Sequence, residues 1–449
     1  MLDGKLSEST KKLAIENLRK RVYQPVLNSL QKNNGQHWWL KGTNNWNAVC
    51  LAGVTASALA FEPDYETRLK LSALAYQQIS GFINGFMNDG YCVEGVGYFS
   101  YGFGYFALLR DALYKSTSGK IDLFENEKVS KMVGYPIKSE IINGIYPAIT
   151  DCRVDTKPAE WLTYYTFNNY NSDQHGLKWK NVKLKGDDMV SVLLFLFGDS
   201  PSKLKIDFEN NNTLRSFFPD LAILNCRPKG KSKNKLGVSI MGGCNGYSHN
   251  HNDLGTYTIV INDETVMGDM GGPTAYTSKT FSSERYSLYK SFSSIGHPVP
   301  FVDNTEQHES TKAKGILIDK SFTDIKDEII FDLKSGYKNN NINSLTREMS
   351  YDRNKNNVTI IDRFDSKNNI DFETCITSRT EFKIENNKII FNTKGNYAIE
   401  VSIEASDNYE IDQYEIKDHA MIPFTRIGIK LKNKQIEGYI ALNYNVISK

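Results

Sequence analysis

The first two hundred residues carry apolar side chains at the spacing of amphipathic helices. Apolar residues recur every three or four positions in two clear sets, Leu69, Ala73, Tyr76, Ile79, Ile83 and Phe86, then Tyr105, Leu108, Leu109, Ala112 and Leu113. The same period runs over residues 9–30, 45–60, 159–167 and 189–197, with Gly, Pro and Asn between them. Stripes of this kind predict helices with one buried face, so we expect an array of antiparallel helical hairpins.

From about residue 221 the period of the pattern changes to two. Apolar and polar residues alternate in short runs, at 236–241, 256–261, 316–318, 358–361, 388–392 and 427–431. Short strands that are separated by Asn, Lys and Gly turns predict an antiparallel β-sandwich. A chain of 449 residues also exceeds the usual size of a single core. We therefore expect a helical domain over residues 1–205 and a β-sandwich domain over residues 206–449.

Composition and charge narrow the class of partner. The chain has 54 basic and 52 acidic residues, a formal charge of +2. It therefore lacks the large net positive charge that is typical of proteins that bind nucleic acids or membrane surfaces. Its six cysteines are scattered without CxxC spacing, which indicates free and buried thiols. We expect no nucleic-acid or membrane partner, and the sequence does not determine the oligomeric state.

The N-terminal residues show no apolar stretch after their basic residues, so they do not resemble a secretory signal. No later run is apolar enough to cross a bilayer. The expected location is therefore cytoplasmic by default, and periplasmic or secreted if the chain is a trimmed piece of an exported protein.

The segment 246–272, GYSHNHNDLGTYTIVINDETVMGDMGG, carries the most informative polar residues of the chain. Asn262 and Asp263 separate two alternating runs. A two-residue turn at this point would pair Thr256 with Asp269 across a hairpin. The pairing would bring Asp269 back toward the histidines that precede the first strand.

This hairpin suggests a metal site. His251, Asp269 and His297 would together make a set of two nitrogen ligands and one oxygen ligand that suits zinc. Asp253 is an alternative for the carboxylate ligand. A single His or Asp in a β-domain is usually only a hydrogen-bonded residue, so the argument depends on the density of these residues.

Several runs resemble a known family. The run SHNHNDLGTYTIVINDETVMGDMGGPTAYTSKTFSSERYS, followed by SSIGHPVPFVDNTEQ, resembles the C-terminal signature of heparinase II/III-like polysaccharide lyases. In the helical region, TNNWNAVCLAGVTASALA resembles the stretch that holds a substrate-facing Asn, and EGVGYFSYGFGYFALL the one that holds a catalytic Tyr. Such families join an incomplete (α/α) toroid to an antiparallel β-sandwich. The resemblance implies a lyase that cleaves a uronic-acid-containing polysaccharide by β-elimination.

In the helical domain, the resemblance implies two catalytic residues. Asn45 matches the residue that binds and neutralises the substrate carboxylate, and Tyr101 matches the phenol that transfers protons, with Tyr98 as its close competitor. Some related alginate lyases have a His directly after this Asn, whereas Trp46 follows here. We expect Asn44, Trp46 and Tyr98 to bind substrate, Trp46 by stacking on a sugar ring.

In the β-domain, the resemblance implies that His251, Asp269 and His297 hold a structural zinc ion. His249 matches a catalytic histidine beside them, on a loop that the metal would fix in place. Arg285 is a candidate to bind a carboxylate or sulfate of the substrate through its planar guanidinium, with an ordinary surface arginine as the equal alternative.

The chemistry of β-elimination explains this set of residue types. The C5 proton of a uronate becomes removable only when donors or a cation hold the charge that develops on the carboxylate, a role for Asn45 and His249. A base must then take that proton, and an acid must protonate the departing O4. A tyrosine that lies near both atoms, here Tyr101, can serve in both steps.

Two other functions stay open at this level. HNHND is similar to the HxHxD core of metal-dependent hydrolases of the metallo-β-lactamase kind, but Leu254 stands where those enzymes usually have a His, and the chain lacks alternating strands and helices. A non-catalytic carbohydrate-binding member of the same fold is the second alternative. The helical region is also shorter than in complete members. The sequence does not identify the polymer, the endo or exo mode, or the stereochemistry of elimination.

Overall fold

The computed structural model of the chain describes residues 5–32, 37–170, 189–199, 201–203, 213–230 and 235–449. The chain forms two compact units. The helical unit comprises Met1–Cys92, Tyr98–Tyr135 and Pro158–Phe208, and the β unit comprises Val93–Gly97, Pro136–Lys157 and Glu209–Lys449. The predicted boundary at 205/206 falls among residues 204–212, outside the described part, and stays a prediction.

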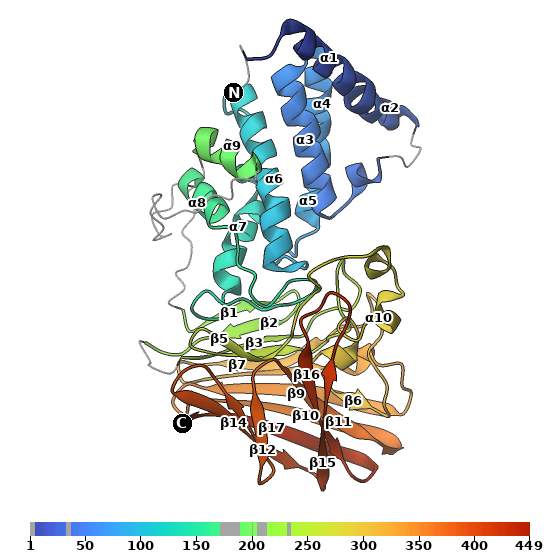
Figure 1. Cartoon of the computed structure of the whole chain (residues 1–449), viewed down its shortest axis with the longest axis vertical. Helices are drawn as coiled ribbons and strands as arrows, with labels where there is room; N and C mark the ends of the chain where they lie inside the picture. The colour runs from blue at the N-terminus through green and yellow to red at the C-terminus, as the bar shows by residue number, and fades with distance from the viewer. Residues whose placement is uncertain (1–4, 33–36, 171–188, 200, 204–212, 231–234) are drawn as a thin grey trace. The chain divides into compact units, whose positions relative to one another are not determined.

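The helical unit is built from the segments in which the sequence shows the helical period (Figure 1). Its α-helices are α1 (Glu8–Leu18), α2 (Gln24–Lys32), α3 (Asn45–Phe61), α4 (Tyr65–Gln78), α5 (Ser80–Asn84), α6 (Gly95–Ser116), α7 (Glu127–Ser139), α8 (Glu160–Asn169) and α9 (Met189–Phe197). A π-helical turn, η1 (Arg19–Tyr23), joins α1 to α2, and a 3₁₀ turn, η2 (Trp38–Lys41), precedes α3. The predicted helices over 9–30, 45–60, 159–167 and 189–197 are confirmed, whereas α7, which contains Pro136, was not predicted.

Polar side chains fix the start of α3, where the first candidate site residues lie. The side chain of Asn44 caps the helix by accepting a hydrogen bond from the backbone N–H of Trp46, at 3.2 Å. Asn47 is fully buried, and its carboxamide donates to the carbonyls of Trp39 and Leu40 and accepts from the N–H of Phe82. A single side chain thus ties the turn η2 and the helix α5 to α3.

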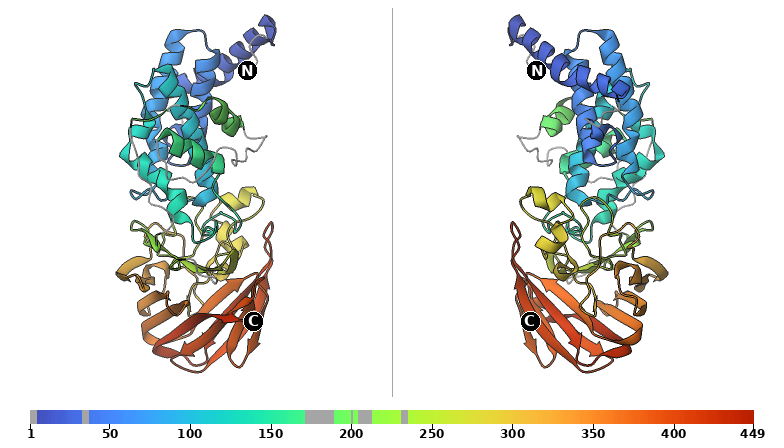
Figure 2. Two further views of the ribbon diagram at one scale, coloured as in Figure 1. Left: turned by 90° about the vertical axis from the view of Figure 1, so that its left-hand side faces the viewer. Right: turned by 90° about the vertical axis from the view of Figure 1, so that its right-hand side faces the viewer.

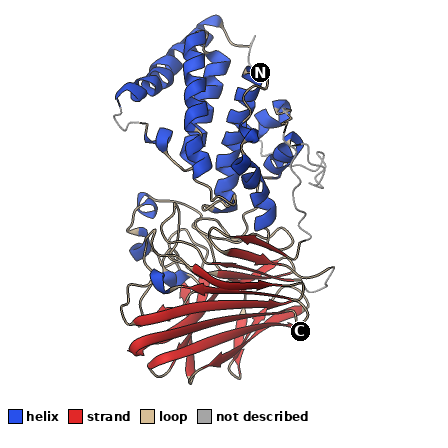
Figure 3. Cartoon of the chain, turned by 180° about the vertical axis from the view of Figure 1, so that it is seen from behind, coloured by secondary structure: helices blue, strands red, loops and turns tan. Residues whose placement is uncertain are grey.

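The described residues of the β unit form three antiparallel sheets (Figures 1 and 2). The five-stranded sheet has the order β1-β2-β3-β4-β5, the eight-stranded sheet β12-β13-β14-β17-β10-β9-β8-β7, and the four-stranded sheet β15-β16-β11-β6. The strands are β1 (Arg215–Phe218), β2 (Ile223–Cys226), β3 (Leu236–Met241), β4 (Tyr257–Ile261), β5 (Glu264–Gly268), β6 (Phe301–Val302), β7 (Ile316–Phe322), β8 (Lys326–Asp332), β9 (Ile342–Asp352), β10 (Asn357–Ile370), β11 (Phe372–Ser378), β12 (Phe382–Glu385), β13 (Lys388–Asn392), β14 (Tyr397–Ala405), β15 (Tyr409–Ile416), β16 (Phe424–Leu431) and β17 (Gln435–Ser448). Short helices such as η6 (Ser278–Phe281) and α10 (Arg285–Leu288) lie in its loops (Figure 3).

The segment Pro136–Lys157 returns to the β unit and covers the five-stranded sheet. One face of β3 and β4 belongs to the core that the three sheets share. On the other face, Ile141 and Ile142 pack against Val260 of β4. Because both faces are covered, β3 and β4 are buried along their whole length. A strand with one face in solvent would instead alternate between buried and exposed residues. This return of the chain positions Asp151, a residue of the candidate site.

The order of helices followed by antiparallel strands confirms the predicted fold class. The strands predicted at 236–241, 256–261, 316–318, 358–361, 388–392 and 427–431 are all present, several of them longer than their sequence pattern. Over the described parts of the chain, the structure contains no helix with the length and apolar character that a membrane span requires.

Candidate active-site residues and a candidate metal centre

The hairpin of β4 and β5 turns at Asn262, as predicted, but its register differs from the prediction by one residue. Val266 forms a bulge in β5, so two residues of this strand lie opposite one residue of β4. Beyond the bulge, the N–H of Asp269 donates to the carbonyl of Tyr257 at 3.1 Å. The predicted pairing of Asp269 with Thr256 was therefore wrong, because a bulge adds one residue that a two-residue turn and regular ladder do not contain.

The hairpin and two neighbouring loops bring the predicted metal ligands together. Potential ligand atoms of His251, Asp253 and His297 all lie within 4.8 Å of one another. Oδ2 of Asp269 lies 3.3 Å from Nδ1 of His297. All four side chains are buried. The cluster within reach of one ion thus contains Asp253, which the sequence offered as the alternative carboxylate, and Asp269 lies beside it against His297.

The unsatisfied atoms of this cluster fit a cation. His251 Nδ1, Asp253 Oδ2, Asp269 Oδ2 and both ring nitrogens of His297 are buried and lack a hydrogen-bond partner within the described structure. A buried polar atom without a partner costs roughly 1 to 3 kcal/mol, so five such atoms in one place are costly unless they bind something. Two imidazoles and two carboxylates form a donor set that suits zinc.

Charge leads to the same conclusion. Burial raises the pKa of Asp253 to about 7, and the neighbouring Asp269 adds to this effect. Burial acts in the same direction on Asp269, but His297 outweighs it and lowers the pKa of that carboxyl. Two carboxylates that are buried side by side stay ionised only if positive charge lies between or beside them. A divalent cation would supply that charge.

Asp151 joins this cluster to the predicted catalytic histidine. Its Oδ2 lies 2.6 Å from Nδ1 of His249, and its Oδ1 lies 3.0 Å from Nε2 of His251. The guanidinium of Arg285 donates to the same Oδ1. Burial opposes ionisation of Asp151, but the hydrogen bonds from His249 and His251 and the charge of Arg285 hold its pKa well below the usual value.

No pattern in the sequence indicates Asp151. It lies in ITDC, a stretch without helical or strand period, and its partners lie 98, 100 and 134 residues further along the chain. The close approach of Gly272 places it there. The N–H of Gly272 donates to the carbonyl of Cys152 at 3.0 Å, and a Cβ atom at Gly272 would lie 2.4 Å from Cα of Asp151. The GDMGG run thus allows the returning segment to approach β5.

His249 and Arg285 differ in their surroundings. His249 is partly exposed, its backbone has a φ of 60°, and its ring lies edge-on to Phe281. Arg285 is buried, with its guanidinium 3.9 Å from the ring centroid of Phe292. It is therefore not a surface arginine, and its guanidinium is already bonded to Asp151 inside the protein. Its expected role in substrate binding stays a prediction.

In the helical unit, the two predicted catalytic residues lie close together. Asn45 is buried at the first turn of α3. Gly102, which directly follows Tyr101 on α6, lies so close to Asn45 that an added Cβ atom would stand 2.0 Å from Asn45 Oδ1. Tyr101 itself is 47% exposed, whereas its competitor Tyr98 is only partly exposed. The structure therefore places the buried carboxamide of Asn45 against the backbone of α6 at the residue that follows Tyr101.

The surroundings of Tyr101 raise the pKa of its phenol. Burial raises the pKa of Tyr101, with smaller contributions from Tyr105 and from Cys50, which lies on α3. Trp46 is 53% exposed and makes an edge contact with Trp38, with ring centroids 6.5 Å apart. These exposed rings have the amphipathic faces that sugars stack on.

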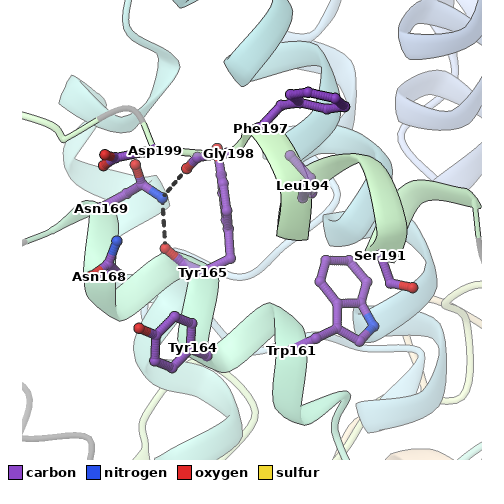
Figure 4. A pocket seen from close by; sticks show the side chains of 10 residues that line it. All are labelled: Trp161, Tyr164, Tyr165, Asn168, Asn169, Ser191, Leu194, Phe197, Gly198 and Asp199. Carbon is purple, nitrogen blue, oxygen red and sulfur yellow. Dashed lines mark hydrogen bonds between the residues drawn. The ribbon is translucent and has the colours of Figure 1, made fainter. Parts of the chain in front are cut away.

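A separate pocket of about 300 Å³ lies in the helical unit, between α8 and α9 (Figure 4). Its lining is aromatic and polar, and it includes Trp161, Tyr164, Asn168 and Asp199. Asn169 bridges its wall by donating to the carbonyls of Tyr165 and Gly198. None of the predicted site residues lines this pocket, and we assign it no function.

Comparison with known proteins identifies the fold. No family model and no curated protein matches the sequence. The structure is similar to heparan sulfate lyase HepC from Pedobacter heparinus, with 13% identity, a TM-score of 0.65, and coverage of 90% of this chain and 60% of that one. It is equally similar to a heparinase III structure, with 15% identity, a TM-score of 0.65 and coverage of 90% and 61%.

A further heparinase III gene product shares 12% identity at a TM-score of 0.64, with coverage of 90% of this chain and 59% of that one. The chain thus spans about 60% of the length of these structures. The likeness confirms the predicted architecture. The chain has the fold of the heparinase III-like polysaccharide lyases, a helical (α/α) toroid region followed by antiparallel β-sheets.

Proposed function

We propose that this protein is a polysaccharide lyase that cleaves a uronic-acid-containing polymer by β-elimination. The observation that carries the proposal is the contact between Asn45 and the Tyr101–Gly102 step of α6, in a fold shared with heparan sulfate lyases. A carboxamide and a phenol are the groups that this reaction needs at the C5 carbon of a uronate.

In the proposed mechanism, the helical unit acts on the sugar directly. The carboxamide N–H of Asn45 donates to the substrate carboxylate and stabilises the charge that develops when C5 loses its proton. The phenolate oxygen of Tyr101 takes the C5 proton and then gives that proton to O4 as the glycosidic bond breaks. The raised pKa of Tyr101 makes its phenolate a stronger base for the C5 proton.

His249 supports this chemistry from the β unit. Its Nδ1 is bonded to the carboxylate of Asp151, which fixes the orientation of the ring. The candidate zinc ligands His251, Asp253, Asp269 and His297 would hold the loop of His249 in place. Zinc supplies structural cross-linking in this proposal.

The burial of the candidate metal ligands favours a lyase over a metal-dependent hydrolase. A catalytic zinc keeps an open coordination position for water, whereas a structural zinc is closed by protein ligands. All four ligand residues are at most 3% exposed. The two-unit architecture, with helices followed by antiparallel sheets, also lacks the alternating layers of the metallo-β-lactamase kind of hydrolase.

A direct assay tests the proposal. The zinc-loaded protein is incubated with heparan sulfate, heparin, alginate and hyaluronan, and absorbance from the 4,5-unsaturated uronate is followed over time. We expect absorbance with at least one polymer, and its loss by a factor of 10² or more in Tyr101→Phe and in His249→Ala, the range typical of general acid–base groups. Tyr76→Phe, an exposed tyrosine on α4, is the matched control.

Two outcomes would contradict the proposal. New reducing ends without the unsaturated chromophore would indicate hydrolysis. Binding of a polymer without any bond cleavage, by a folded protein that has its metal, would indicate a carbohydrate-binding protein.

A further inference from the structure

A single buried carboxylate lies between the candidate metal centre and the partly exposed His249. We propose that Asp151 is a positioning residue that couples the two, with Oδ1 holding His251 and Oδ2 holding His249. The distances are 3.0 Å and 2.6 Å. The catalytic consequence of this coupling rests on the proposed function, but the structural coupling does not.

The chemistry of a carboxylate fixes the proton positions on both rings. An ionised aspartate only accepts hydrogen bonds, so Nδ1 of His249 and Nε2 of His251 must each carry a proton and donate it. In its neutral form, each ring then has an unprotonated second nitrogen. For His251 this is Nδ1, the atom that faces the metal cluster without a partner in the described structure. For His249 it is Nε2, the ring nitrogen that can then accept a proton.

This arrangement is the one that metal-binding histidines generally need. A ligand histidine usually donates its other ring N–H to a carboxylate, which fixes the tautomer and the orientation of the ring. Here the same carboxylate has a second oxygen, and that oxygen is bonded to His249. One residue therefore sets the tautomer of the ligand and of the candidate catalytic ring.

The loop that carries both histidines needs such an anchor. His249 has a φ of 60°, a backbone conformation that costs roughly 1 to 2 kcal/mol for a residue with a side chain. Asp151 is in turn fixed by the close approach of Gly272 to its Cα atom. The strained loop is thus held against a rigid point next to β5.

Arg285 gives the two oxygens of Asp151 different roles. Its guanidinium donates to Oδ1, the oxygen shared with His251, and a guanidinium cannot accept a hydrogen bond. If Asp151 were replaced by Asn, the new NH₂ group would therefore turn away from Arg285 and face His249. The substitution Asp151→Asn should leave the bond to His251 in place and reverse the tautomer of His249.

The test combines three measurements on the full-length zinc-loaded protein and on Asp151→Asn. They are the zinc content per chain, the ring ¹⁵N signals of His249 at mildly alkaline pH, and kcat and KM on the polymer that the lyase assay identifies. The His249 signals are assigned by their absence in His249→Gln. Asp155→Asn is the control, because Asp155 lies four residues away with an exposed side chain.

We expect wild type to show a protonated Nδ1 and an unprotonated Nε2 on His249. In Asp151→Asn we expect the reverse pattern, retained zinc, and a fall in kcat on the order of 10² to 10⁴ with little change in KM, as for a tautomer-setting aspartate elsewhere. Asp155→Asn should match wild type in all three measurements.

A wild-type His249 that carries its proton on Nε2 would overturn the proposal, even if Asp151→Asn fails to fold. An Asp151→Asn protein in which His249 still carries its proton on Nδ1 would also overturn it. This holds whether the variant keeps its zinc or loses it. The zinc and ¹⁵N measurements need no substrate. If they give the expected result and no polymer is cleaved, the coupling stands and the proposed function fails.

Discussion

Asn45 and Gly102 approach each other so closely that the position of Gly102 cannot hold a side chain without moving the carboxamide. An added Cβ atom would lie 2.0 Å from Oδ1 and 2.8 Å from Cγ of Asn45. Since Gly102 follows Tyr101 on α6, this contact sets the separation of the proposed carboxylate-binding group from the proposed proton-transferring group. The absence of a side chain at one position is thus a feature of the candidate site.

The first prediction is that Gly102→Ala lowers kcat/KM by at least tenfold. The new methyl group must displace Asn45 or shift α6, and overpacking of this kind costs about 1 to 3 kcal/mol. The measurement is initial lyase rate against substrate concentration, together with the thermal unfolding midpoint.

The matched control is Gly53→Ala, a glycine in α3 with no atom within 4 Å of the added Cβ position. We expect this variant to gain about 0.5 to 1 kcal/mol of stability, because alanine is the better helix former, and to keep wild-type kinetics. Gly102→Ala with wild-type kcat/KM would show that Asn45 needs no such placement.

Local patterns predicted most of the elements, and they failed where a distant segment decides the structure. The period of 3.6 identified α3 and α8, and the period of two identified β3 and β4. The alternation of apolar residues does not reveal the bulge at Val266, so the predicted register of Asp269 was wrong by one residue. The helix α7 was missed, and it contains a proline.

The candidate site shows the same limit. The residues of the HNHND run and Asp269 stand out because they are close in sequence. Asp151 is as central to the geometry as any of them, but its three partners lie about a hundred residues away, and no periodicity reports a contact of that kind. Arg285 was recognised as a candidate, whereas its burial depends on Asp151 and Phe292 and could not be predicted.

The second prediction concerns Gly272, which lets the returning segment approach the β unit. A Cβ atom at this position would lie 2.4 Å from Cα and 2.5 Å from the carbonyl of Asp151. Both contacts are backbone atoms that cannot rotate away, so Gly272→Ala should shift Asp151 and destabilise the β unit by about 1 to 3 kcal/mol. Denaturant unfolding and zinc content measure the two effects.

Gly395→Ala is the control for this substitution, because no atom lies within 4 Å of its added Cβ position. We expect it to unfold within about 0.5 kcal/mol of wild type. A Gly272→Ala protein with normal stability and normal zinc content would mean that the segment tolerates displacement at Asp151.

The third prediction is that the protein holds one zinc ion per chain in the cluster of His251, Asp253, Asp269 and His297. Removal of zinc by a chelator should lower the unfolding midpoint, because a ligand that binds only the folded state stabilises it by about 2.7 kcal/mol at a hundredfold excess over Kd. His297→Ala should lose the ion and show the lower midpoint without chelator.

His419→Ala, at an exposed position of the β unit, should keep both zinc and midpoint. The metal analysis and the unfolding curve are read together. Full zinc content in His297→Ala, or an unfolding midpoint that does not respond to chelator in wild type, would argue against a structural zinc in this cluster.

The fourth prediction tests the aromatic surface beside Asn45. Trp46 and Phe61 lie on the same helix, α3, and each is 53% exposed. A sugar that stacks on Trp46 gains about 0.5 to 1.5 kcal/mol, so Trp46→Ala should raise KM by roughly two- to tenfold with a smaller effect on kcat. Phe61→Ala removes a similar exposed ring at the far end of the helix and should leave KM unchanged. If the two substitutions change KM equally, the change belongs to α3 as a whole. If Trp46→Ala lowers kcat alone, the indole lies at the reacting bond and not at a binding surface.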